Sequence, residues 1–196
     1  MKIEMLLDKL ENKLFFSVSE LADILGIKED SARVFASRYV KKGIFVRLKR
    51  DFYVLKQNLN MYNKEQLFKI ANFLQVPSYI SFMTALEYYG ITTQVQRNFF
   101  ESAALRRSIS FESAGLSFNY YKIKRVLYFD FIRINDFFIS TKEKAFVDAV
   151  YLWSFGKYTI DFDSLDFDKL DKDRLKSVIQ PYPEKTKRMV RKLCSI

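Results

Sequence analysis

The sequence has no histidine, one cysteine, five glycines and three prolines among its 196 residues. Without histidine, imidazole acid–base catalysis and His-ligated metal sites are excluded. The single cysteine, Cys194, excludes an internal disulfide and favours a reducing compartment. It has no nearby base to activate it as a nucleophile. The scarcity of glycine and proline argues against a disordered or low-complexity chain.

Long apolar runs are also missing. No stretch approaches the roughly 18 apolar residues that a membrane span requires. The first residues, MKIEMLLDKLENK, place charges among the apolar positions, unlike the continuous apolar core of a signal peptide. We therefore expect a cytoplasmic protein with no membrane partner.

The sequence also lacks motifs that bind cofactors or metals. There is no glycine-rich phosphate loop. The acidic stretch 161–173 lacks the glycine and the glutamate that a calcium-binding EF-hand loop needs at its sixth and twelfth positions. We expect this stretch to be a solvated surface, and we expect no cofactor, no bound metal and no enzymatic activity.

The residues that are present favour a packed core and an anionic partner. Hydrophobic residues make up 49% of the chain and aromatic residues 17%. The formal net charge is +10, which makes nucleic acid the first candidate partner. Residues 28–56 alone carry nine Lys or Arg against three acids, a local charge of +6.

The first part of the chain has the order of a winged helix-turn-helix. Apolar spacing predicts an amphipathic helix over residues 3–14. Ser17 and Glu20 form a capping-box pattern for a second helix that ends at Gly26. A third helix is expected over residues 28–43, and a β-hairpin follows it. This order is typical of DNA-binding winged helices.

The hairpin has a cationic tip. Ile44, Val46 and Leu48 alternate along its first strand, and Phe52–Leu55 forms the second. If the apolar side of the third helix faces the core, its opposite side can enter a major groove, while the hairpin touches phosphate. The predicted DNA-binding residues are Ser31, Arg33, Ser37, Arg38, Lys41, Arg47, Lys49 and Arg50.

The rest of the chain predicts a second domain. Residues 56–62 read as a joint, so we expect a DNA-binding domain over 1–57 and an α/β domain over 58–196. Short aromatic and β-branched runs between residues 98 and 140 predict a largely antiparallel sheet flanked by helices. The expected fold class is α+β. Two helical segments, YISFMTALEYYG before the sheet and TKEKAFVDAVYLW after it, complete this domain.

Three segments carry a family resemblance. They lie within residues 16–55, in SYISFMTALEYYGI, and in STKEKAFVDAVYL, which is similar to a Pro/Thr-x-Glu-Lys-Ala-x-x-Asp pattern. With these segments the chain resembles the AbiEi family, the antitoxins of abortive-infection, type IV toxin–antitoxin pairs. The resemblance covers roughly residues 10–155. The start of the third helix departs from it, because Lys28, Glu29 and Asp30 stand where relatives often have Ser or Thr.

The resemblance implies two roles. One is repression of the protein's own operon by binding inverted repeats in double-stranded DNA, and the other is neutralisation of a nucleotidyltransferase-like toxin without a required stable complex. The candidate antitoxin residues are Glu143, Lys144, Asp148, Arg106 and Arg107. The spacing of Lys144 and Asp148 on one helix also fits a structural ion pair.

Two alternatives stay open at this point. In the first, the chain is a plain winged-helix regulator whose second domain senses a ligand or dimerises. In the second, it is a nuclease-like enzyme that uses the acids between Asp130 and Asp148.

Overall fold

The computed structural model describes residues 3–196, which form a mixed α+β fold. The chain divides into two compact units. Unit 1 contains the described residues up to Ile70 together with Ser113–Gly115, and unit 2 contains Ala71–Glu112 and Leu116–Ile196. Within residues 3–196 no helix is long and apolar enough to cross a membrane.

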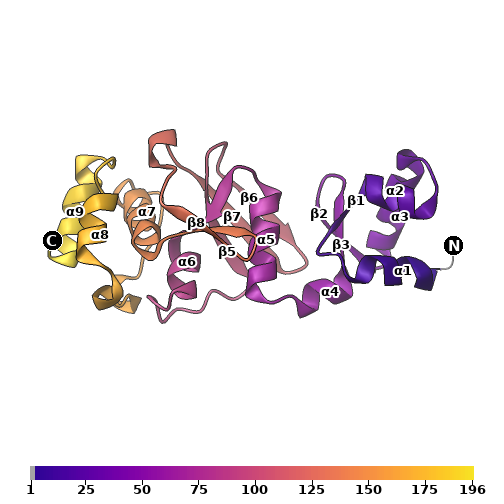
Figure 1. The fold of residues 1–196 in the computed structure, drawn as a ribbon, viewed down its shortest axis with the longest axis horizontal. Coiled ribbons are helices and arrows are strands. Elements are labelled where there is room, and N and C mark those ends of the chain that lie inside the picture. The colour runs from indigo at the N-terminus through magenta and orange to yellow at the C-terminus, as the bar shows by residue number, and fades with distance from the viewer. Residues whose placement is uncertain (1–2) are drawn as a thin grey trace. The chain divides into compact units, whose positions relative to one another are not determined.

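Unit 1 contains helices packed against a three-stranded sheet of order β1-β3-β2 (Figure 1). Its elements are α1 (Ile3–Glu11), β1 (Phe16–Ser17), α2 (Val18–Leu25), α3 (Glu29–Lys41), β2 (Phe45–Lys49), β3 (Phe52–Leu55) and α4 (Lys56–Met61); α5 (Lys64–Leu74) leads into unit 2.

The helix ends in unit 1 follow the sequence signals. The Ser17 hydroxyl accepts a hydrogen bond from the Glu20 amide at 3.1 Å, and the Glu20 carboxylate accepts one from the Ser17 amide at 2.8 Å. This confirms the capping box. Gly26 ends α2 with a φ of 66°, a left-handed conformation that glycine adopts without a steric cost.

The predicted alternation on the first hairpin strand is wrong. Phe45 and Leu48 are the buried residues of β2, whereas Ile44 and Val46 are only partly buried. The register of β2 against β3 shifts between Arg47 and Lys49, so strict period-two alternation does not hold.

The expected joint at residues 56–62 is a helix tied to unit 1. The Asn58 side-chain amide donates to the Glu11 carbonyl at 2.6 Å, and the Tyr62 hydroxyl donates to the Leu14 carbonyl at 2.7 Å. The division between the units consequently falls later, between Ile70 and Ala71.

Unit 2 is built on a six-stranded sheet of order β6-β7-β5-β4-β9-β8. Its strands are β4 (Ser78–Ile80), β5 (Phe99–Ala104), β6 (Ile109–Ser113), β7 (Leu116–Lys122), β8 (Phe131–Ile134) and β9 (Phe137–Ser140). Its helices are α6 (Phe82–Tyr88), α7 (Lys142–Ser154), α8 (Lys172–Val178) and α9 (Glu184–Cys194), with short 3-10 turns at Arg125–Leu127, Phe162–Ser164 and Phe167–Lys169.

The sheet is mixed, and the expectation of a largely antiparallel sheet is wrong. β4 pairs antiparallel with β5, and β8 with β9, but β5 and β7 are parallel over six residue pairs, and β4 and β9 are parallel. The chain runs from β5 to the edge strand β6 and returns as β7 between them. Consecutive strands therefore do not pair in simple succession.

The helix predicted from residue 79 is also shorter than expected. Ser78–Ile80 forms β4, and α6 begins at Phe82. Because β4 is buried on both faces, its apolar run has no alternation that separates it from a buried helix.

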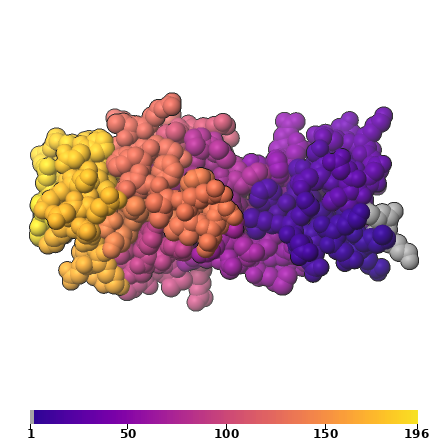
Figure 2. All heavy atoms as spheres, viewed as in Figure 1, coloured from indigo at the N-terminus to yellow at the C-terminus, as the bar shows by residue number. Residues whose placement is uncertain are grey.

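α7 packs against α6 and against both α8 and α9. The two C-terminal helices form one continuous surface in yellow (Figure 2).

Candidate functional site

The exposed side of α3 carries four of the five residues of this helix that the sequence predicted to bind DNA. Ala32 and Ala36 are fully buried against the core of unit 1. As a result Ser31, Ser37 and Arg38 are exposed on the opposite side, as is Lys41 in the last turn. These four side chains form one polar, cationic helix surface.

Arg33 lies differently from the expectation that it projects away from the protein. Its Nε donates to the Asp51 carboxylate at 2.9 Å, and another guanidinium nitrogen donates to Asp30 at 2.9 Å. Glu29 lies 3.6 Å from the same guanidinium. The Arg33 guanidinium lowers the pKa of Asp51 and ties the start of α3 to the β2–β3 turn.

The β2–β3 turn, taken as residues 47–51 with the end of β2, presents two arginines rather than three equivalent cations. The side chain of Arg50 is 86% exposed, and Arg47 is exposed too. Lys49 is only partly exposed; its ammonium lies over the Phe52 ring, 5.1 Å from the centroid, and burial lowers its pKa. Of the predicted hairpin contacts, Arg47 and Arg50 are the better placed for a phosphate.

In unit 2, Lys144 and Asp148 form the centre of a buried hydrogen-bond network. The Lys144 ammonium donates to Asp148, to the Tyr79 hydroxyl at 2.8 Å and to the Tyr182 hydroxyl at 2.7 Å. Both hydroxyls donate in turn to Asp148, at 2.9 and 2.6 Å, and Ser81 donates at 2.9 Å. All three ammonium protons of Lys144 and four acceptor positions of the Asp148 carboxylate are therefore hydrogen-bonded.

This network lies inside unit 2, away from solvent. The Lys144 and Asp148 side chains are both 0% exposed, and burial lowers the pKa of Lys144. Burial, followed by the charge of Asp148, raises the pKa of Tyr79 and Tyr182 well above 10. Neither charged side chain reaches the surface. These two candidate residues are therefore not exposed for direct contact with a partner.

The remaining candidate residues of unit 2 are not assembled into one site. Glu143 is buried and accepts a hydrogen bond from the Asp171 amide at 3.0 Å. Asp130 bonds to Arg174 at 2.7 Å. Across residues 3–196 no three Asp, Glu, Cys or His side chains are grouped as metal ligands. Arg106 and Arg107 are exposed in the loop after β5.

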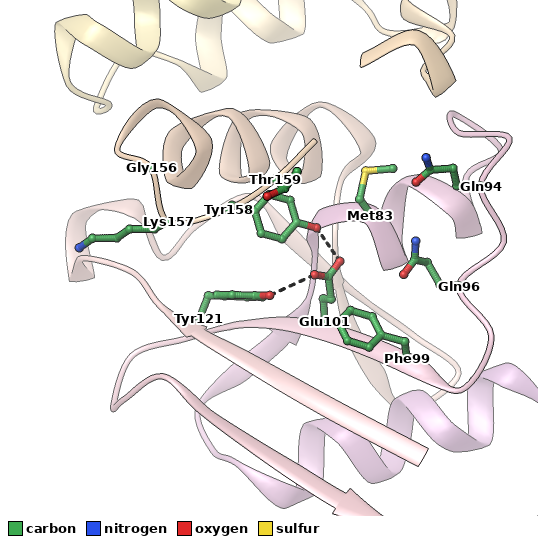
Figure 3. Close-up of a pocket in the computed structure, with 10 residues that line it drawn as sticks. All are labelled: Met83, Gln94, Gln96, Phe99, Glu101, Tyr121, Gly156, Lys157, Tyr158 and Thr159. Carbon is green, nitrogen blue, oxygen red and sulfur yellow. Dashed lines mark hydrogen bonds between the residues drawn. The ribbon is translucent and has the colours of Figure 1, made fainter. Parts of the chain in front are cut away.

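A cavity of about 510 Å³ in unit 2 was not anticipated from the sequence. Glu101 on β5 is one of the residues that line it and is 2% exposed (Figure 3). The Tyr158 hydroxyl donates to one oxygen of its carboxylate at 2.7 Å, and the Tyr121 hydroxyl lies 3.4 Å from the other. Burial raises the pKa of Glu101 to about 7. The signal in the sequence is the single charged residue in the strand FFESAA.

We expect Glu101 to make stability depend on pH. Its pKa is about 7 in the folded chain against an ordinary value of 4.5, so the folded state holds the proton more tightly. Protonation of Glu101 therefore stabilises the folded chain fully below about pH 4.5, and this contribution is lost as the pH rises through about 7. The free energy of unfolding should fall by on the order of 3 kcal/mol over this window. Urea unfolding across this window should show the decline for the wild type but not for Glu101→Gln.

The control for this titration is Glu112→Gln, which changes an exposed glutamate in the same sheet. Its pH profile should follow that of the wild type. A constant difference in unfolding free energy between wild type and Glu101→Gln over the whole window would contradict the prediction.

No family model, no curated protein and no solved structure matches this chain.

Proposed function

We propose that this chain is a DNA-binding transcriptional repressor of its own operon, with unit 1 as a winged helix-turn-helix, and that it also acts as an antitoxin. The observation that carries the DNA-binding role is the exposed polar side of α3, linked to the arginine-bearing β2–β3 turn by the Arg33–Asp51 hydrogen bond. In this role α3 enters the major groove and the turn is the wing.

The charges at the start of α3 support this assignment. Glu29, Asp30 and Asp51 would repel phosphate, but all three lie against the Arg33 guanidinium. Arg33 therefore offsets part of the negative charge of these acids instead of reading a base. This leaves Arg38 as the arginine on α3 for a bidentate contact with guanine.

Arg33 and Arg38 provide a matched test on duplex DNA from upstream of the protein's own gene. Arg38→Ala should relax base preference at one position, by about 1–3 kcal/mol if its contact is bidentate. Arg33→Ala should weaken binding to all sequences alike, because three acids lose their counter-charge. Competition binding with a set of singly substituted duplexes separates the two effects. Relaxed preference caused by Arg33→Ala would instead place that side chain in the groove.

The antitoxin role is proposed for unit 2. It rests on the AbiEi resemblance of the segments containing α6 and α7, and the partner is a nucleotidyltransferase-like toxin encoded beside this gene. Since Lys144 and Asp148 are buried, the exposed pair Arg106 and Arg107 is the first surface to test.

In a growth-rescue assay with that toxin, the triple variant Arg47→Ala/Lys49→Ala/Arg50→Ala should still protect cells. Arg106→Ala/Arg107→Ala should protect less at an unchanged melting temperature, because it removes two exposed charges and no buried side chain. Loss of rescue by the triple variant alone would mean that repression explains the protection.

A further inference from the structure

Glu101 differs from the other buried acids in the part of the chain that the structure describes. Asp148 is paired with Lys144, and Glu143 lies 3.8 Å from the Lys142 ammonium. Glu101 forms no ion pair with a lysine or arginine of residues 3–196, and it lines a cavity. Burying a carboxylate without a counter-charge is unfavourable, and a ligand in the cavity is able to supply that charge.

The lining around Glu101 favours a ligand that donates hydrogen bonds. Tyr158 and Tyr121 use their hydroxyl protons on the carboxylate, which leaves lone pairs on both phenol oxygens. The Gln94 amide nitrogen donates to Asp161 at 2.9 Å, so its carbonyl oxygen remains as an acceptor. The Phe99 side chain lines the same cavity, and aromatic rings attract cations.

We propose that this cavity binds a small organic cation whose ammonium or guanidinium charge lies beside the Glu101 carboxylate, while its N–H groups donate to the free lone pairs of the Tyr121 and Tyr158 oxygens and to the Gln94 carbonyl. Its volume of about 510 Å³ lies within the usual range for small-ligand pockets. Lys157 also lines the cavity, but its side chain extends away from Glu101 (Figure 3). This proposal does not depend on the DNA-binding or antitoxin role.

Binding of such a cation is coupled to proton release. In the free protein the pKa of Glu101 is about 7, and a bound cation favours the ionised form. The groups that face the carboxylate are Tyr121 from β7, Tyr158 from the segment after α7, and backbone N–H groups of Met83 and Thr84 at α6. Burial raises the pKa of both tyrosines, so they stay neutral and Glu101 is the group that titrates.

The test uses the full chain and two probes of the same shape, butylguanidinium and the neutral butylurea, in isothermal titration. Butylguanidinium should bind at least about tenfold more tightly than butylurea, and its affinity should fall about tenfold between about pH 8 and about pH 6. Glu101→Gln should abolish the preference for the cation. Tyr121→Phe, which keeps the ring and the carboxylate, should change affinity only a few-fold.

A second variant covers the case in which Glu101→Gln does not fold. Gln96→Trp places a large ring at the cavity wall without touching the Glu101 hydrogen bonds, and it should block butylguanidinium. Equal binding of the two probes, no binding of butylguanidinium to the folded wild type, or unchanged binding in Gln96→Trp would each overturn the proposal.

Discussion

Lys144→Met should destabilise the full chain by about 3–5 kcal/mol, the usual cost of removing one partner from a buried ion pair. The variant leaves Asp148 fully buried with its hydroxyl donors but without a counter-charge. Tyr79 and Tyr182 also lose the ammonium whose protons their oxygens accept. Urea unfolding followed by far-ultraviolet circular dichroism measures the loss as a lower midpoint.

The control is Lys176→Met, which breaks an exposed ion pair with Asp173. Exposed pairs contribute about 0–1 kcal/mol, so this variant should unfold close to the wild-type midpoint. The double variant Lys144→Met/Asp148→Asn should lose less than the sum of its single changes, because it leaves no unpaired charge. Similar midpoints for Lys144→Met and Lys176→Met would show that the network contributes little.

Arg47→Ala/Arg50→Ala should weaken binding to the upstream duplex by roughly a hundredfold, if each arginine makes one charge-assisted hydrogen bond to a phosphate. The slope of log affinity against log salt concentration should fall by about two, one for each arginine removed. Adding Lys49→Ala should change the slope little further, because the Lys49 ammonium is partly buried over Phe52. Fluorescence anisotropy over a salt series gives both quantities.

A slope that falls by about three in the triple variant would restore Lys49 as an equal partner of phosphate. An unchanged slope in the double variant would remove the β2–β3 turn from DNA binding altogether.

Local signals in the sequence predicted much of unit 1. The capping box of Ser17 and Glu20, the end of α2 at Gly26 and the apolar side of α3 depend on residues within a few positions of one another. The interaction of Arg33 with Asp51 was not predictable, because it joins residues 18 positions apart through the hairpin turn.

Unit 2 was less predictable because its decisive interactions join residues that are distant in sequence. The i, i+4 spacing of Lys144 and Asp148 predicted an ion pair, but not that Tyr79, 65 residues away from Lys144, would complete it. The parallel pairing of β5 with β7 depends on β6 taking the sheet edge, which no local pattern encodes. Glu101 acquires its surroundings from Tyr121 and Tyr158 in the same way.

Hydrogen exchange of the full chain with and without the upstream duplex tests the DNA-binding assignment most directly. The proposed interface predicts slower exchange over α3 and the β2–β3 hairpin, residues 29–55, and unchanged exchange in the sheet of unit 2. Protection confined to residues 71–196 while the duplex is bound would contradict it.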